Sequence, residues 1–355
     1  MMEYYSVEEC CMILDSKRIP VPSTKRKSGI YPYYGANGVQ DYVDDYIFDG
    51  EYVLVAEDGG NFGSKEKPIA YRVSGKCWVN NHAHILKPYE FLDVDFLCYS
   101  LMFYNTNGIV NGTTRKKLNQ AQLRQMKIPK LPLDLQQKVA LTFNKINSIK
   151  NSLQQYLVNL DVIVKSRFIE LFGDPISNPN DWEIVPLGKR CEIVTGNTPS
   201  RLEPENYGEY IEWIKSDNIN TPSTFITKAQ ECLSEIGFKK CRFVEAGSLL
   251  MTCIAGSINC IGNVAVTDRR VAFNQQINAI VPKQDKVLYL YWLMLLSKPA
   301  IHSTINMALK GILSKRQLAE MAFPFPPIVL QEQFADFVKQ VDKSKFSCYT
   351  NNSYN

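Results

Sequence analysis

The chain has 355 residues, which is too long for one ordinary hydrophobic core, so we expect two domains. Hydrophobic residues make up 45% and charged residues 21%, proportions that exclude a disordered chain. The formal net charge of +4 is compatible with nucleic-acid binding but does not require it. No stretch approaches the roughly 18–20 apolar residues of a membrane span, which argues against a membrane protein.

The cysteines and histidines limit the chemistry further. Ten cysteines form no CxxC pair and no Cys/His cluster, so we expect no zinc site, and buried reduced thiols in a cytoplasmic protein. His82 and His84 lie two residues apart on an expected strand and are expected to pack. None of the three histidines has a Ser or Cys partner in a catalytic arrangement. The sequence therefore predicts no metal site and no active site.

The first half of the chain predicts a globule followed by one long helix. YVLVAE (52–57) is a candidate buried strand, and DGGNFG (58–63) looks like a hairpin turn because it leads into SKEKP and not into a helix. Residues 134–172 contain no proline or glycine, and their apolar residues form a heptad seam that predicts packing along a partner helix. At 1.5 Å per residue this helix would span roughly 58 Å, so we interpret it as a spacer. The seam consists of Val139, Phe143, Ile146, Ile149, Leu153, Leu157 and Leu160.

The second half predicts similar elements. LLMTCIAG (249–256) is a candidate buried strand, and LYLYWLMLLSKPAI (288–301) predicts a buried helix that ends near Pro299. A second helix follows, with its own seam at Leu330, Phe334 and Val341. This seam fades after Phe346, so we expect the second helix to be shorter than the first.

The two halves repeat each other. KLNQAQLRQMKIPKLPLDLQQKVA aligns without a gap on ILSKRQLAEMAFPFPPIVLQEQFA at an offset of 195 residues, which places Gln136 opposite Gln331. Shorter similarities, such as VNNHAHILKP with FNQQINAIVP, keep the same order. We therefore expect an α/β protein with two similar domains in tandem, at 1–133 and 174–328. The spacer helix takes 134–173, and a shortened second helix with a polar tail takes 329–355.

Several local sequences resemble the specificity subunit of Type I restriction–modification enzymes. In the second copy they are PLGKRCEIVTGNTPSR, IEWIKSDNIN, FNQQINAIVP and ILSKRQL followed by PFPPIVLQEQ; the first copy has weaker versions such as YPYYGANGVQDYV. The resemblance implies that each domain reads one half of a split sequence in double-stranded DNA and that the helices set the gap.

The resemblance also implies partners. Methyltransferase subunits would bind the helices, restriction subunits would join through them, and S-adenosylmethionine would be bound by the methyltransferase, with no cofactor in this chain. The truncated second helix departs from the family pattern, which puts assembly with two methyltransferase subunits in question and leaves self-association through the long helix open.

The candidate DNA contacts lie in loops and basic patches that recur at matching places in both copies. Lysine and arginine suit phosphates, whereas arginine, amides and hydroxyls suit base edges. Tyr33 and Tyr34 could pack instead, and Asn274 with Gln275 could hold loops instead. In the first copy the candidates are Lys17, Arg18, Lys25, Arg26, Lys27, Tyr33, Tyr34, Arg115, Lys116 and Lys117. In the second copy they are Thr198, Ser200, Arg201, Lys215, Ser216, Asp217, Asn218, Asn274, Gln275, Lys310, Lys315 and Arg316.

Two other classes of protein stay open as alternatives. A DNA methyltransferase or endonuclease with fused recognition domains would need a catalytic sequence. The nearest strings to the Asn/Asp-Pro-Pro-aromatic sequence of N6-adenine methyltransferases are FPPI (325–328), which lacks the polar first residue, and NPND (178–181), which lacks the second proline. A duplicated protein-binding scaffold without DNA contact is opposed by the paired basic loops.

Overall fold

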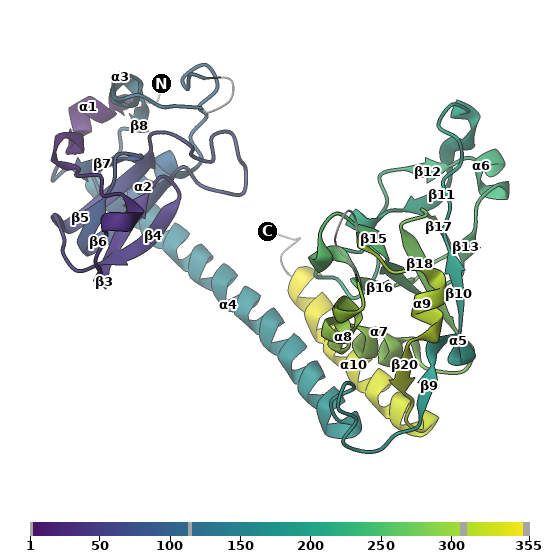
Figure 1. The fold of residues 1–355 in the computed structure, drawn as a ribbon. Helices are drawn as coiled ribbons and strands as arrows, with labels where there is room; N and C mark the ends of the chain where they lie inside the picture. Colours follow the sequence, from purple (N-terminus) through teal and green to yellow (C-terminus); the bar gives the residue numbers. More distant parts are fainter. Residues whose placement is uncertain (1–2, 113–115, 306–310, 351–355) are drawn as a thin grey trace. The chain divides into compact units, whose positions relative to one another are not determined.

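The computed structural model describes residues 3–112, 116–305 and 311–350 of the chain. It contains two compact units, Met1–Ser152 and Leu153–Asn355 (Figure 1). The boundary between the units falls inside α4, one continuous helix from Leu133 to Phe172. The predicted long helix is therefore confirmed, and so is the α/β class with two domains in tandem, because both units combine sheets with helices.

Unit 1 is built on a six-stranded sheet with strand order β2-β7-β5-β6-β3-β4. The central strand β5 contains all of YVLVAE except Glu57 and is buried on both faces, since Val53 and Val55 belong to one core cluster and Leu54 to another. Helix α2 (Val94–Met102) lies against β5 and β6. The strands of this sheet are β2 (Cys11–Ile13), β3 (Ser28–Gly35), β4 (Gly38–Val43), β5 (Phe48–Ala56), β6 (Ala70–Val79) and β7 (Ala83–Pro88).

Unit 2 distributes its strands over smaller sheets with orders β10-β18-β14-β16, β12-β11-β17-β13, β15-β19 and β20-β9. The predicted strand at 249–256 is divided between β14 and β15, which belong to different sheets. The strands are β9 (Ile184–Pro186), β10 (Cys191–Thr195), β11 (Tyr207–Ile214), β12 (Cys232–Leu233), β13 (Phe243–Val244), β14 (Leu249–Thr252), β15 (Ile254–Ala255), β16 (Val264–Val266), β17 (Val271–Phe273), β18 (Ile277–Pro282), β19 (Gly311–Ile312) and β20 (Ala322–Pro324).

The helices of unit 2 surround an apolar core that also takes in the C-terminal part of α4. The predicted buried helix ends at Leu296, and Pro299 lies in the first turn of the next helix, α8, where a missing N–H breaks no helical hydrogen bond. The helices are α5 (Leu187–Arg190), α6 (Glu235–Lys239), α7 (Val287–Leu296), α8 (Lys298–Ser303), α9 (Lys315–Glu320) and α10 (Ile328–Thr350).

The repeat is visible element by element in the part of each unit that leads into the long helix, which we call the base of the unit. In unit 1, β1 (Tyr4–Ser6) pairs with β8 (Lys127–Pro129) and leads into α1 (Val7–Cys10). In unit 2, β9 pairs with β20 in the same antiparallel register and leads into α5. Helix α3 (Gln120–Gln125) and its counterpart α9 both begin with a capping box. The proline-rich segments thus form short paired strands before the chain enters the next long helix.

A buried glutamine fixes the first turn of α4 to unit 1. The side-chain nitrogen of Gln136 donates to the carbonyl oxygens of Leu131 (2.8 Å) and Phe91 (3.0 Å), and its oxygen accepts from the backbone N–H of Asp93 (2.8 Å). Asp93 is the N-cap of α2. Gln136 therefore joins α4, the segment before it and the start of α2.

Gln331 does the same for α10 in unit 2. Its side-chain nitrogen donates to the carbonyl oxygen of Pro326 (3.0 Å) and to Oδ1 of Asp285 (2.9 Å), and its oxygen accepts from the backbone N–H of Lys286 (3.0 Å), the N-cap of α7. The two glutamines are 1% and 0% exposed, so the duplication has preserved a buried three-way junction in both copies.

Within unit 2, α10 packs antiparallel to the C-terminal part of α4. Phe172 lies 5.5 Å from Phe334 between ring centroids, and farther along the pair Lys345 Nζ lies 2.6 Å from Asp161 Oδ1. Of the predicted seam residues, Leu160, Phe334 and Val341 are buried here, and Leu330 is partly buried.

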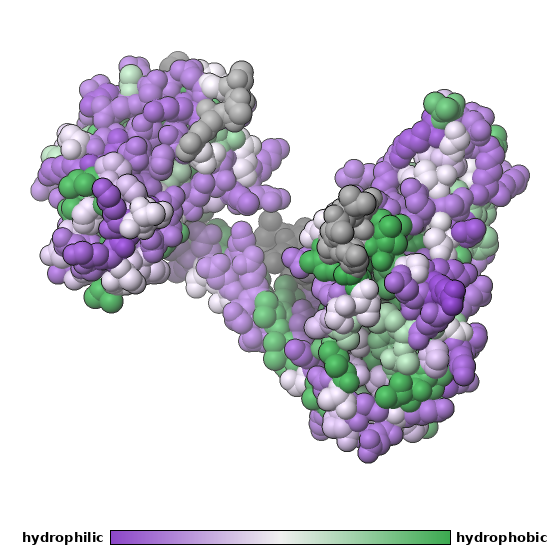
Figure 2. Space-filling model, viewed as in Figure 1, coloured by the Kyte–Doolittle hydropathy of each residue, from purple (hydrophilic) through white to green (hydrophobic). Residues whose placement is uncertain are grey.

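The middle of α4 has a different environment. Ile146 and Ile149 are 53% and 59% exposed, and Leu153 and Leu157 are half-buried. Nearer the start of α4, Val139 packs partly against the core of unit 1, and Phe143 stacks on Tyr99 at 5.0 Å while remaining 45% exposed. Figure 2 shows hydrophobic residues among hydrophilic ones along the middle of α4. Helix α10 has 23 residues against 40 in α4, and within unit 2 it packs along the end of the predicted seam.

Candidate nucleic-acid interface

Three of the predicted loops of unit 2 come together in the fold. The backbone N–H of Asn197 donates to the carbonyl oxygen of Phe273 (3.1 Å), and that of Asn274 donates to the carbonyl oxygen of Ile214 (3.0 Å). The hydroxyl of Thr198 donates to the side-chain oxygen of Gln275. The segments that carry residues 198–201, 215–218 and 274–275 therefore form one cluster, although they are far apart in the sequence.

A charged group lies at the surface of this cluster. The Arg201 guanidinium donates to both carboxylate oxygens of Glu231 at 2.7 and 3.1 Å, and Lys215 pairs with the same carboxylate. Arg201 lies over the rings of Tyr207 (4.8 Å) and Trp213 (5.6 Å), and Lys215 Nζ lies 5.3 Å from the Trp213 ring. Stacking and ion pairing together hold both cations in place.

The remaining candidates of unit 2 divide by exposure. Thr198, Ser200, Asp217, Gln275, Lys315 and Arg316 are exposed, and Ser216 is half-buried. Asn218 and Asn274 are each 7% exposed and serve their own loops: Asn218 Oδ1 accepts from the N–H of Lys215 (3.0 Å), and Asn274 Oδ1 accepts from the N–H of Gln276 (3.0 Å). The Asn274 side chain therefore makes a structural hydrogen bond within its loop, which is the alternative role considered for it. Lys310 lies outside the described residues.

In unit 1, Arg18 belongs to a buried network. Its side chain is 13% exposed, and Nη1 donates to Glu57 (2.7 Å) and to the carbonyl oxygen of Ala83 (2.8 Å). Lys117 lies 3.2 Å from the other oxygen of Glu57, with its side chain half exposed. Arg18 therefore connects strands inside the unit and presents little of its guanidinium to solvent.

The loop that carries the other unit 1 cations folds back on Tyr33. Arg26 stacks over the Tyr33 ring at 4.1 Å and pairs with Asp41 (3.2 Å). The Tyr33 ring is 1% exposed, so it is packed in the core and presents no face for base stacking, and Tyr34 is partly buried against the second core cluster. In contrast, Lys17, Lys25, Lys27 and Lys116 are exposed and form no ion pair with other described residues. Arg115 lies outside the described residues.

One group could be mistaken for a metal centre. Asp15, Glu57 and His84 bring potential ligand atoms within 4.8 Å of one another. Their oxygens and nitrogens are already used, because His84 Nδ1 lies 2.6 Å from Asp15, His84 Nε2 lies 2.8 Å from the carbonyl oxygen of Leu118, and Arg18 pairs with Glu57. Burial raises the pKa of the Asp15 carboxyl, but the hydrogen bond and charge of His84, the N–H of Ile85 and the charge of Arg18 together outweigh it and hold that pKa below its ordinary value. The donor set fits a protein network and not a cation.

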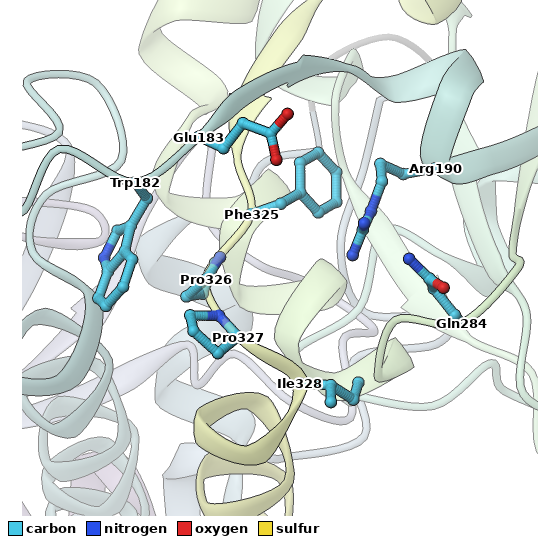
Figure 3. Close-up of a pocket in the computed structure, with 8 residues that line it drawn as sticks. All are labelled: Trp182, Glu183, Arg190, Gln284, Phe325, Pro326, Pro327 and Ile328. Carbon is cyan, nitrogen blue, oxygen red and sulfur yellow. The ribbon is translucent and has the colours of Figure 1, made fainter.

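A pocket of about 560 Å³ lies where the chain enters α10 (Figure 3). Trp182 stands on one side, Arg190 and Gln284 face each other on the other, and Pro326 and Pro327 lie between them. Arg190 donates to both oxygens of Asp285 at 2.9 and 2.5 Å, so its charge is already neutralised. None of the predicted DNA contacts lines this pocket, which is completed by Glu183, Phe325 and Ile328.

Sequence reasoning missed Glu231, Trp213 and Tyr207, which complete the Arg201 cluster. Trp213 and Lys215 are two residues apart on IEWIKSDN, a spacing that places both side chains on one face of an extended segment and could have associated them. Glu231 is 30 residues from Arg201, and no local pattern links the two. Among the described helices, none is long and apolar enough to cross a membrane.

Comparisons with known proteins agree with the repeat. A family model described as the Type I restriction modification DNA specificity domain matches residues 1–159 and again residues 179–351. The putative type I restriction enzyme specificity subunit S.HindORF215P of Haemophilus influenzae is 38% identical over 148 residues, which are 42% of this chain and 38% of that protein. The putative MjaX specificity subunit of Methanocaldococcus jannaschii is 21% identical over 272 residues, 70% of this chain and 61% of that one. The chain thus spans less than two thirds of both relatives.

Solved structures show the same fold. The S subunit of a Type I restriction–modification system from M. genitalium matches with a TM-score of 0.63 over 99% of this chain and 92% of that one, at 13% identity. A chain from a structure described as concerning complex assembly and conformational transition of the type I R-M system matches with a TM-score of 0.53, covering 99% and 94% of the two chains at 14% identity.

Proposed function

Because the chain belongs to the Type I restriction modification DNA specificity family, we propose that it is the non-catalytic subunit that selects the DNA sequence for a restriction–modification enzyme. Each unit reads one half of a two-part target in double-stranded DNA, and the helices set the distance between the halves. A stiff helix suits this role, since half-site spacing on a duplex is a length along a rod.

One observation carries this proposal: the family model matches twice, and its two matches coincide with two structural copies that share the same base. The copies differ above that base, where one has a six-stranded sheet and the other several smaller ones. A constant base with a variable upper part is what two readers of different half-sites require. The exposed cations Lys17, Lys25 and Lys27 supply phosphate contacts in unit 1, and the Arg201 cluster supplies contacts in unit 2.

The partner is a methyltransferase subunit, which binds S-adenosylmethionine and through which restriction subunits join. Helix α4 offers it an apolar surface at Ile146 and Ile149, which are 53% and 59% exposed. Changing both residues to aspartate should abolish methyltransferase binding without unfolding the chain, because both side chains face solvent. Light scattering of the chain alone would show whether the same surface instead holds a second copy of the chain.

Methylome sequencing tests the function directly. Cells that contain the methyltransferase and this chain should show methylation at a two-part motif with a fixed gap, and cells with the methyltransferase alone should not. A variant with Lys17, Lys25 and Lys27 changed to alanine should methylate less at every site. Identical methylomes with and without the chain would contradict the proposal, and methyl transfer by the purified chain alone would favour an enzyme with fused recognition domains.

A further inference from the structure

The carboxylate of Glu231 occupies an unusual place in the candidate interface of unit 2. It lies between the two cations of the cluster: Oε1 accepts from Arg201 Nη1, and Oε2 accepts from Arg201 Nη2 and contacts Lys215 Nζ. Its backbone carbonyl accepts from the N–H of Trp213 (3.1 Å), the residue over whose ring both cations lie. The backbone of Glu231 is thus held to that of Trp213, over whose ring both cations lie.

The ion pairs of Glu231 do little for the stability of the fold. The side chains of Arg201, Lys215 and Glu231 are 56%, 35% and 32% exposed, and exposed ion pairs typically contribute about 0.2–1 kcal/mol. A buried carboxylate such as Asp15 is needed as the hydrogen-bond acceptor of buried donors, but Glu231 at the surface is not needed in this way. A carboxylate at this position therefore has its main effect on what approaches the two cations from outside.

We propose that Glu231 is a specificity-determining residue, which keeps Arg201 and Lys215 from binding DNA phosphates without regard to sequence. This inference rests on the proposed DNA-binding function. With Glu231 ionised, Arg201, Lys215 and Glu231 carry a net charge of +1, whereas the two cations alone would carry +2. To reach the two cations, a phosphate must displace the Glu231 carboxylate, which is already hydrogen-bonded to them. The carboxylate also repels the phosphate over a few ångströms, well within the Debye length of about 8 Å at physiological salt.

A base edge is affected differently. Of the five N–H groups of a guanidinium, two are directed at Glu231, which leaves three for another acceptor. The acceptor atoms of guanine or thymine carry no net charge, so the carboxylate repels them much less than it repels a phosphate. The cluster consequently favours contacts with correctly placed bases and disfavours contacts with the backbone, which is a form of discrimination by repulsion of the wrong ligand.

The test titrates the full chain with a fluorescent duplex of random sequence at several salt concentrations. Glu231→Gln keeps the shape of the side chain and removes its charge. We expect this variant to bind the random duplex about tenfold more tightly at low salt for each cation that it frees. The slope of the logarithm of affinity against the logarithm of salt concentration should become steeper by about 0.9 per freed cation. Selection from a duplex library should then give a less sharply defined half-site than the wild type gives.

Two controls isolate the charge. Glu231→Asp retains it and should remain within about twofold of the wild type. Glu332→Gln removes the same charge from an ion pair with Lys286 (2.8 Å) at the base of α10, and should leave duplex binding unchanged. Melting temperatures of all variants confirm that each is folded.

Glu231→Ala provides a second test that does not depend on the folding of Glu231→Gln. It removes the same charge, so it should also bind the random duplex about tenfold more tightly at low salt for each cation that it frees, whereas wild-type affinity in this variant would overturn the proposal. A Glu231→Gln protein that is folded and binds with wild-type affinity and slope would overturn it as well. If the wild-type chain binds no duplex even at low salt, the DNA-binding function itself fails and this inference falls with it.

Discussion

The two units use the same charged residue types in opposite ways. In unit 1, Glu57 joins Arg18 and Lys117, with side chains of Arg18 and Glu57 only 13% and 15% exposed. In unit 2, Glu231 joins Arg201 and Lys215 at the surface. Burial decides the role: the first group holds strands together, whereas the second remains accessible to a ligand. A cation in a candidate interface is therefore informative only when its exposure and its partner are known.

The largest expected effect is the loss of the buried network of unit 1. Asp15→Ala removes the acceptor for His84, for the backbone N–H of Ile85 (3.0 Å) and for Gln120 (3.0 Å). Removing one partner of a buried charged pair typically costs about 3–5 kcal/mol, whereas Glu231→Ala should cost at most about 1 kcal/mol. Urea denaturation measures both, with hydrogen exchange of β7 assigning the loss to unit 1. Equal costs for the two variants would contradict the comparison.

The same comparison has a pH dependence. The pKa of Asp15 in the folded unit lies below its ordinary value, so the ionised carboxylate stabilises the folded state. This contribution is complete above the ordinary aspartate pKa of about 4 and is lost as the pH falls through the lowered value. The difference in stability between wild type and Asp15→Ala should therefore be constant near neutrality and shrink in acid. A difference that grows below pH 4 would have the wrong sign.

A second comparison sets the covered end of α4 against its uncovered part. Phe334 is 0% exposed between Phe168 and Phe172, whereas Phe143 is 45% exposed and touches Tyr99. Phe334→Ala should cost about 3–5 kcal/mol, as buried Phe→Ala changes typically do. Phe143→Ala should cost about 1 kcal/mol, the contribution of one aromatic pair. Thermal unfolding of the two variants measures both losses of stability, and similar shifts in melting temperature would contradict the comparison.

The base of each unit could be predicted from the sequence because its contacts are local or repeat at a fixed offset. The Asn119–Gln122 and Ser314–Gln317 capping boxes span three residues, and the offset of 195 residues places Gln136 on Gln331. The long helix was equally predictable, since its period and its lack of proline and glycine are properties of one segment.

The interface was less predictable because its decisive contacts link distant residues. Arg18 and Glu57 are 39 residues apart, and Arg201 and Glu231 are 30 apart. In the sequence, Arg18 and Lys17 are neighbours in one basic loop, but the first is drawn into the network and the second faces solvent. Tyr33 was ambiguous for the same reason, since alternation along a strand does not tell which face the sheet covers. Exposure at these positions is decided by tertiary packing, on which a loop sequence carries no information.

The smallest effects concern the two buried glutamines. Gln136→Ala and Gln331→Ala each leave buried donors and acceptors without partners, which should cost about 1–3 kcal/mol. The exposed neighbours Gln137 and Gln333 provide matched controls, whose alanine variants should stay within about 0.5 kcal/mol of the wild type.

Of these two variants, Gln331→Ala should be the more destabilising. Gln331 donates to the carboxylate of Asp285, whereas Gln136 donates to the carbonyl of Phe91, and hydrogen bonds to charged groups are the stronger kind. The side chain of Asp285 is fully buried, so its carboxylate would retain Arg190 but lose one hydrogen bond that water cannot easily replace. Urea denaturation of the two variants and their controls measures this order. A larger loss for Gln136→Ala would mean that the junctions, although alike in geometry, are not equivalent in energy.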